Sequence, residues 1–271
     1  PYSKKYTVDG TNHLGIYFNT MNFTVNDESL GSISHEQLIV IPGTTYTVSN
    51  STITMSDGRI VTSSPKTVTG YTTKFTGYTI KPNSTTINAK TTVKANFTKE
   101  ANTYKITLDN KSATTAGTTS IYEKYNTGIY LDSDLKTAMT TTTNPIIKPT
   151  RSYTVSFNAN NTGITMPSAI TKSYSYSGHY TDAASGTQMI NENGYITNSF
   201  KNTSYTANAI LYAHWKAKPS VTIPSISKTG YTCSWNTSAD GKGTTYNGGD
   251  VTDKLNTQTL YAVCAANTYT V

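Results

Sequence analysis

Short phrases recur along this chain, and they constrain its fold more than any other feature. The phrase "ANTYKI" begins at Ala101 and "ANTYTV" begins at Ala266, while "ILYAHW" at 210–215 resembles "TLYAVC" at 259–264. A phrase that closes one unit and opens the next is typical of tandem repeats. We therefore expect a series of related small modules.

An alternating segment is expected to open each module. In "SYTVSFNA", Tyr153, Val155 and Phe157 fall on one face and polar residues fall on the other. This period of two predicts a strand with one buried face. Segments of this kind occur at 45–50, 103–110, 152–159 and 268–271.

Two further elements complete each expected module. A central aromatic strand is followed by Gly- and Asn-rich turns, and then by a closing strand with an aromatic residue or cysteine at its end. The central strands are predicted at 69–79, 172–181 and 228–237, and the closing strands end at Phe97, Trp215 and Cys264.

Composition supports an all-β to β-rich fold with thin cores. Only 35% of the 271 residues are hydrophobic and 14% are charged, and Tyr (21 residues) far outnumbers Phe and Trp. Thr and Tyr favour strands, and the scarcity of Leu and Ala argues against long helices. Short helical turns are expected to be few: 133–139, capped by Ser133, is one candidate, and 34–43 predicts a short strand ending in a Pro-Gly turn.

The repeats predict beads on a string. We expect β modules at 1–99, with a divergent repeat from about 44, and a last complete module at 217–265. An enlarged region fills 100–216, with a split into two modules at 151/152 as the alternative. Residues 266–271 would be the first strand of a further, truncated repeat.

The last expected module carries a family resemblance. "KTGYTCSWNTSADGKGTTYNGGD" followed by "TLYAVC", over 226–264, resembles the Listeria–Bacteroides repeat, also called the internalin B-repeat; 152–215 is the second match and 44–97 a loose one. The resemblance covers about two-thirds of the chain. It implies small β-grasp-like modules in an extracellular protein of a Gram-positive bacterial surface or cell wall.

Enzymatic and metal chemistry find little support in the sequence. His13, His35, His179 and His214 lack metal-ligand spacing, and no nucleophile elbow or phosphate-binding loop occurs. His179 stands where the family has Trp, and His214 falls on the solvent side of a closing strand. The Gly-rich stretch with Asp240, Asn247 and Asp250 is too sparse for calcium, and a turn explains it better. We expect no catalytic residue, cofactor or metal.

The two cysteines occupy matching positions in the repeats. Where other units have Phe75 with Phe97 or Tyr176 with Trp215, the last has Cys233 with Cys264. If the two positions face each other, a disulfide replaces an aromatic contact, and it requires an oxidising compartment. Two reduced, buried cysteines are the alternative.

The functional prediction is a non-enzymatic spacer or stalk with a role in adhesion. Lys residues scattered singly give the net charge of +7, which predicts a solvated surface with at most weak contact to host or cell-wall polymers. Neither nucleic-acid binding nor membrane insertion is expected. The alternative is a carbohydrate-binding accessory module of a surface glycosidase, with Trp235 and Tyr246 as glycan contacts, although both residues also suit a core.

Overall fold

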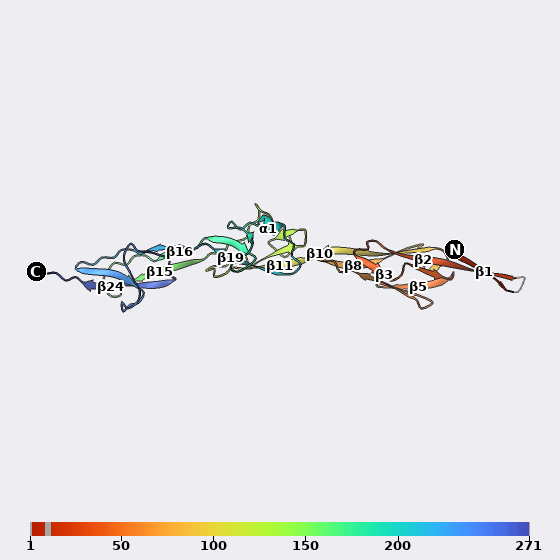
Figure 1. Ribbon diagram of the computed structural model, residues 1–271, viewed down its shortest axis with the longest axis horizontal. Helices are drawn as coiled ribbons and strands as arrows, with labels where there is room; N and C mark the ends of the chain where they lie inside the picture. The colour runs from red at the N-terminus through yellow and green to blue at the C-terminus, as the bar shows by residue number, and fades with distance from the viewer. Residues whose placement is uncertain (1, 9–11, 271) are drawn as a thin grey trace. The chain divides into compact units, whose positions relative to one another are not determined.

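The computed structural model describes residues 2–8 and 12–270, with side chains from residue 17 onward. The chain divides into two compact units, Pro1–Thr103 with Lys124–Thr127 and Tyr104–Glu123 with Gly128–Val271 (Figure 1). The described residues are almost entirely strands, turns and loops, and their one helix, α1 (Asn198–Lys201), is a single turn. The predicted β-rich fold class is confirmed.

One sheet of the first unit joins strands from its beginning and its end. Its order is β1-β2-β10-β8, and β4 also pairs with β2. β2 and β10 run parallel, with Met21 beside Thr91 and Val25 beside Ala95. The strands are β1 (Tyr2–Val8), β2 (Asn12–Val25), β4 (Gln37–Val40), β8 (Tyr71–Lys81) and β10 (Thr91–Ala101).

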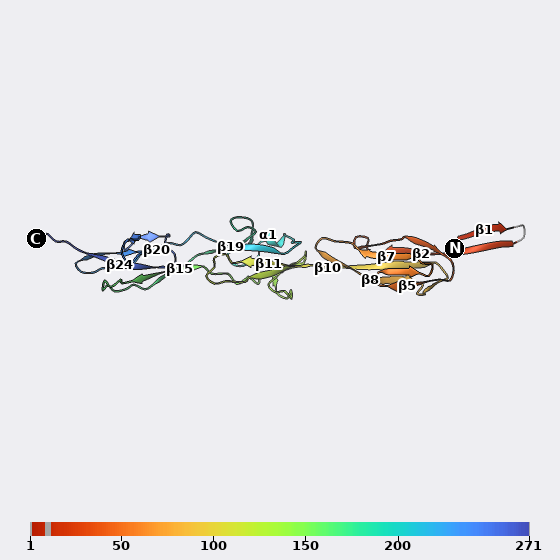
Figure 2. The ribbon, with the colours of Figure 1, turned by 90° about the horizontal axis from the view of Figure 1, so that it is seen from below.

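A second sheet of this unit supplies the other half of its core (Figure 2). Its order is β3-β7-β6-β5-β9, and alternate side chains point inward, as Ile53 and Met55 do on β6. They pack with Met21 and Phe23 of β2 and Val93 of β10 in one buried cluster. The strands are β3 (Gly31–Ile33), β5 (Thr44–Ser49), β6 (Thr52–Met55), β7 (Ile60–Pro65) and β9 (Thr86–Ile87).

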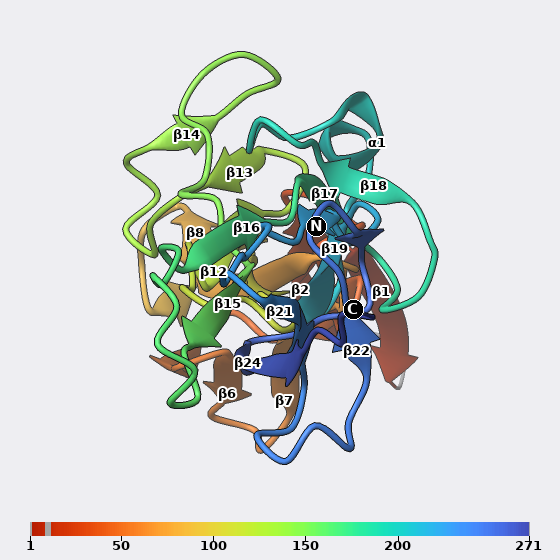
Figure 3. The same cartoon turned by 90° about the vertical axis from the view of Figure 1, so that its left-hand side faces the viewer.

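The second unit contains a seven-stranded sheet of order β14-β13-β12-β11-β19-β17-β18. Figure 3 shows its two ends, with β13 and β14 at one side and β18 and α1 at the other. Ile106, Leu108 and Leu211 form the centre of its core, together with Phe200 of α1. The strands are β11 (Thr103–Asp109), β12 (Ser120–Lys124), β13 (Gly128–Tyr130), β14 (Ala138–Met139), β17 (Tyr176–Tyr180), β18 (Gln188–Ile190) and β19 (Ala209–Trp215).

A five-stranded sheet of order β16-β15-β24-β21-β22 completes the second unit, with the small pair β20 and β23 beside it. Tyr153 and Val155 of β15 pack with Trp235 of β21 and Leu260 of β24 in its core. The strands are β15 (Ser152–Asn158), β16 (Ile170–Ser173), β20 (Val221–Thr222), β21 (Tyr231–Asn236), β22 (Thr245–Tyr246), β23 (Val251–Thr252) and β24 (Gln258–Ala266).

The two sheets of the second unit are interleaved in sequence. The chain forms β11 to β14 of the seven-stranded sheet, then β15 and β16 of the five-stranded sheet, then returns for β17 to β19, and finally builds β21 to β24. Residues 217–265 therefore do not form a separate unit, in contrast to the predicted boundaries. Their sheet is complete only with β15 and β16, which lie at 152–158 and 170–173.

One relation between strands occurs three times. β2 is parallel to β10, β11 is parallel to β19, and β15 is parallel to β24. In each case an early strand lies directly beside a late strand of the same sheet. Residues 103–110 and 152–159 thus supply the early strands β11 and β15, and the segments expected to end at Phe97, Trp215 and Cys264 supply the late strands β10, β19 and β24.

Two other segments predicted to open a module do not have that position. Residues 45–50 form β5, which pairs with β6 and β9, whereas the parallel partner of β10 is β2. Alternation reveals a half-buried strand but does not identify its neighbour. At 268–271, residues 268–270 form no strand, because no neighbour pairs with them, and Val271 lies outside the described residues.

The expected helical turn at 133–139 is also wrong. Asp132 accepts hydrogen bonds from the backbone N–H groups of Lys136 and Thr137, and Leu135 has φ of +58°. A carboxylate that binds the backbone in this way competes with a helix. By contrast, the strand within 34–43 is confirmed as β4, followed by Pro42 and Gly43 in a turn.

Candidate functional site

The repeat positions identified from the sequence lie directly opposite each other across antiparallel strands. Phe75 pairs with Phe97, and their ring centroids are 5.6 Å apart in an edge-to-face contact. Tyr176 pairs with Trp215 at 5.9 Å in the same geometry. Each of these pairs lies near the end of a closing strand, where it ties that strand to the central aromatic strand.

The two cysteines form the corresponding pair of the last sheet. Cys233 of β21 lies opposite Cys264 of β24, and a disulfide with a Cα–Cα distance of 4.1 Å joins them. Both residues are half-buried, and Cys264 packs against the core. The bond encloses 31 positions of the sequence, including β22 and β23.

A second repeated pair places a large side chain opposite an alanine. Tyr78 faces Ala95, His179 faces Ala213, and Trp235 faces Ala262; they are equivalent positions of the three central strands. The three alanines are almost fully buried, and they leave room for the ring on the neighbouring strand. This position is therefore a packing position in all three sheets.

Burial contradicts the predicted glycan contact at Trp235. Its side chain is 0% exposed, lies 4.8 Å from the Phe157 ring centroid and donates from Nε1 to the carbonyl of Pro224. A sugar cannot stack on a ring that is covered on both sides. Tyr246, its partner across β21 and β22, is half-buried against the same core, so these two residues do not form an open aromatic surface.

His179 is the buried polar member of this repeated position. Its ring is 0% exposed, and Nδ1 shares a 2.5 Å hydrogen bond with the hydroxyl of Tyr176. Nε2 has no partner among the described residues. Burial lowers the pKa of His179 to about 4, an effect that the charge of Asp109 only partly offsets. His179 is thus neutral at pH 7 and part of the core.

The Gly-rich stretch after β21 is organised by a residue that the sequence reasoning did not single out. The Asn236 side chain, 1% exposed, donates to the carbonyls of Gly241 and Gly243 and accepts from the N–H groups of Ser238 and Gly243. One buried side-chain amide thus pairs with four backbone groups of the turn. Asp240 and Asp250 bind neighbouring backbone N–H groups. In the described part of the chain no group of three or more His, Cys, Asp or Glu could hold a metal.

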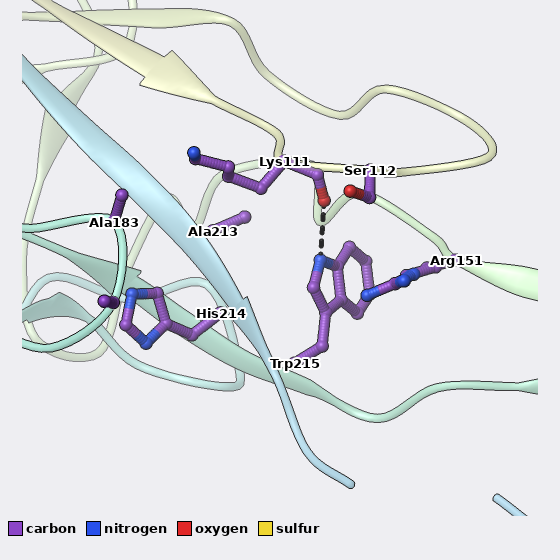
Figure 4. A pocket seen from close by; sticks show the side chains of 8 residues that line it. Lys111, Ser112, Arg151, Ala183, Ala213, His214 and Trp215 are labelled. Atoms are coloured by element: carbon purple, nitrogen blue, oxygen red, sulfur yellow. Dashed lines mark hydrogen bonds between the residues drawn. The ribbon is translucent and has the colours of Figure 1, made fainter. Parts of the chain in front are cut away.

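The second unit has a polar groove around Trp215 (Figure 4). Trp215 donates from Nε1 to the carbonyl of Lys111 at 2.8 Å, which fixes the indole, and Arg151 points toward its ring. The groove has a volume of about 270 Å³, and its walls also include Ala183 and His214. Among the described residues, the ion pairs are Arg59–Asp57 and Lys136–Asp134, so Lys111 and Arg151 have no carboxylate partner.

No sequence motif indicates this groove, because its residues come from four separate segments. His214, expected on a solvent side, is half-buried, stacks on Tyr180 and shares a hydrogen bond with the carbonyl of Asp182. His35 is half-buried, and its Nδ1 shares a hydrogen bond with the hydroxyl of Ser34. The side chain of His13 lies outside the described ones.

Comparisons with known proteins identify no relative: no family model, curated protein or solved structure matches the chain. The resemblance to the Listeria–Bacteroides repeat stays a prediction that rests on the residues. No helix in the described residues is long and apolar enough to cross a bilayer.

Proposed function

We propose that the chain is a non-enzymatic spacer of an extracellular bacterial surface protein, built from tandem β modules. The pairing of β2 with β10, β11 with β19 and β15 with β24 supports this proposal most directly. When the early and late strands of a sheet are parallel, the chain enters at one end of the sheet and leaves at the other. Modules of this design can follow one another along a line, and in this sense they are β-grasp-like.

The same pairing gives a spacer resistance to tension. Pulling on the two ends of the chain slides an early strand along its parallel neighbour, so several hydrogen bonds must break together. A pull across the strands would break them one after another. The disulfide between Cys233 and Cys264 ties β24 to β21 close to the point where the chain leaves the last sheet, and it agrees with an oxidising extracellular location.

Force spectroscopy tests this function. Thr24 and Lys94 are exposed register partners on β2 and β10, so handles on non-natural residues there pull the pair apart transversely. We expect the first unit to rupture at a force at least twofold higher when the chain is pulled from its ends. The handle-bearing protein pulled from its ends is the matched control. Equal forces in the two geometries would contradict a load-bearing spacer.

A second candidate function is binding of an anionic glycan in the groove around Trp215, which would make the chain an accessory module of a surface glycosidase. The groove favours it because a fixed indole lies beside Arg151 and Lys111, for which the described residues provide no carboxylate partner. Aromatic rings stack on sugars, and guanidinium groups bind carboxylates.

Calorimetric titration with a uronic-acid oligosaccharide and its neutral counterpart distinguishes this candidate. Binding of the acidic sugar alone, lost in Arg151→Gln but kept in Lys242→Gln on an exposed turn, would support it. No binding of either sugar leaves the spacer as the function.

A further inference from the structure

A turn with the sequence Thr-Gly-Tyr occurs at the start of two central strands. In Val68–Tyr71 and in Lys228–Tyr231, the tyrosine N–H donates to the carbonyl of the first residue at 3.0 Å. Gly70 and Gly230 have φ of +77° and +79°, so both positions require glycine. The two turns have the same backbone geometry.

The residue that follows each closing strand binds this turn in the same way. Asn102 and Asn267 each donate a backbone hydrogen bond of 2.9 Å to the carbonyl of the turn glycine. Their side chains also match: Thr72 donates to Oδ1 of Asn102, and Thr232 donates to Oδ1 of Asn267. The turn, the strand end and the asparagine therefore form one repeated surface, Gly70–Tyr71–Asn102 in the first unit and Gly230–Tyr231–Asn267 in the second.

In the first unit this surface is occupied by a tyrosine. The ring of Tyr125 covers Gly70 so closely that a Cβ atom there would lie 2.4 Å from its carbons. The ring also meets Tyr71 edge-to-face at 5.3 Å, and the Tyr125 N–H donates to the carbonyl of Asn102 at 2.9 Å. Tyr125 lies on the tight turn Lys124–Thr127, which is part of the first unit.

In the second unit the equivalent surface is open. No described atom lies within 4 Å of the position of a Cβ atom on Gly230, and Tyr231 is 40% exposed. Asn267 is exposed, and the ammonium group of Lys228 lies 4.2 Å above the Tyr231 ring. The glycine that has no side chain beneath Tyr125 is thus repeated at a place where no described atom covers it.

We propose that Gly230, Tyr231 and Asn267 form a docking site for a tyrosine-tipped β-turn of the kind of Lys124–Thr127, presented by a following module. This inference rests on the proposed series of modules. The glycine leaves room for the flat ring, Tyr231 offers an edge-to-face contact, and the Asn267 carbonyl receives the N–H of the incoming tyrosine. A second copy of this chain fits less well, since its own Tyr125 is held on Gly70.

Nuclear magnetic resonance on the isotope-labelled full chain tests the site. The probe is a backbone-cyclised hairpin peptide with the sequence of residues 119–131, which carries Tyr125 on its turn. We expect saturable shifts confined to the amides of Gly230, Tyr231 and Asn267, and at least fivefold weaker binding of the Tyr125→Ala peptide. Gly230→Ala should abolish the shifts, whereas Gly58→Ala, at an equally open glycine with φ of +88°, should not.

A cyclic peptide binds weakly, so a second measurement presents the same turn within one chain. The chain is lengthened after Asn267 by a copy of residues 103–139, with Tyr or Ala at the position equivalent to Tyr125. Slower amide exchange at Gly230 in the Tyr version alone supports the site. Identical exchange in both versions, together with no peptide binding, overturns it, as does dimerisation of the unmodified chain through Gly230. Neither outcome bears on the rupture forces that test the spacer.

Discussion

At the residue scale, the three central strands solve one packing problem with three different rings. Tyr78, His179 and Trp235 all lie opposite a buried alanine, and each ring needs a partner for its polar atom. Tyr78 bonds to Ser51 and Ser63, and Trp235 bonds to Pro224. His179 is satisfied only at Nδ1. His179 is therefore the one of these three residues that we expect to make the stability of its sheet depend on pH.

Because the pKa of His179 is lowered, we expect the second unit to lose free energy of unfolding in mild acid. Its pKa is about 4 in the folded chain and 6.5 when exposed, so between these values the unfolded chain binds the extra proton. The stabilisation is complete above pH 6.5 and disappears as the pH falls to about 4, a loss of about 3 kcal/mol. Hydrogen exchange of the second unit, measured against pH, should show it.

His179→Gln isolates this effect, because the amide keeps a group for the Tyr176 hydroxyl but does not titrate. The variant should lose less stability between pH 6.5 and 4 than the parent. Equal slopes for parent and His179→Gln would show that another group governs this range. Five aspartates have lowered pKa values because their carboxylates accept hydrogen bonds: Asp27, Asp57, Asp132, Asp182 and Asp240. Their protonation therefore lowers the stability of the fold only below about pH 4.

Two bulge glycines give a second prediction at this scale. Gly77 and Gly178 have φ of +130° and +128°, and the strand register shifts beside both. Alanine should cost about 1–3 kcal/mol at either position because of this φ. Gly178→Ala should cost more, since its Cβ would lie 2.2 Å from the carbonyl oxygen of Ile190, whereas Gly77 has nothing within 4 Å. Exchange measured separately in each unit ranks the two; equal losses would contradict the clash.

At the element scale, the sequence predicted strand pairs better than it predicted sheets. Aligning the repeats found the facing positions Phe75–Phe97, Tyr176–Trp215 and Cys233–Cys264, because cross-strand neighbours are under a local size constraint. The segment "CSW" at 233–235 lacks the glycine of "FTGY" at 75–78, and β21 accordingly pairs with β24 without a register shift. These features depend on residues that touch.

The sheet to which each strand belongs was harder to predict. A strand shows the same alternation of apolar and polar residues whichever strand pairs with it. The segment 172–181 was predicted as one strand. It contains the end of β16 and all of β17, which belong to different sheets. The chain crosses between them at Tyr174, whose N–H donates to the carbonyl of Arg151, and at Ser175, whose carbonyl accepts from the N–H of Lys216. The groove around Trp215 was missed for the same reason, since it exists only after these segments meet.

The disulfide between β21 and β24 allows a prediction about the stability of their sheet. Reduction should destabilise the five-stranded sheet by about 3–4 kcal/mol, the loop-entropy value for 31 positions, and should leave the first unit unchanged. Thiol labelling of the folded, unreduced protein should find no free cysteine. Cys233→Phe with Cys264→Phe, which copies the Phe75–Phe97 pair, should make the sheet insensitive to reductant. Free thiols in the unreduced folded protein would contradict the bond.

At the scale of the whole molecule, interleaving decides which pieces of the chain can fold. The sequence predicts a complete module at 217–265, but that segment lacks β15 and β16. Without them β24 loses its parallel neighbour, and Trp235 and Leu260 lose the side chains of Tyr153, Val155 and Phe157. A sheet stripped of half its core cannot offset the entropy of ordering its chain.

We therefore expect residues 217–267 alone to be unfolded and a rearranged fragment to fold. In that fragment, residues 151–174 are joined by a short Gly-Ser linker to residues 217–267. The linker can be short because Ser175 and Lys216 share a 2.9 Å backbone hydrogen bond, so the two ends already lie together. Near-ultraviolet circular dichroism of Trp235 and dispersion of amide resonances distinguish folded from unfolded fragments. Changing Val155 to Asp in the joined fragment is the control, because it places a charge in the core and should unfold it. If residues 217–267 fold without β15 and β16, the modules are independent beads, and the five-stranded sheet does not depend on interleaving.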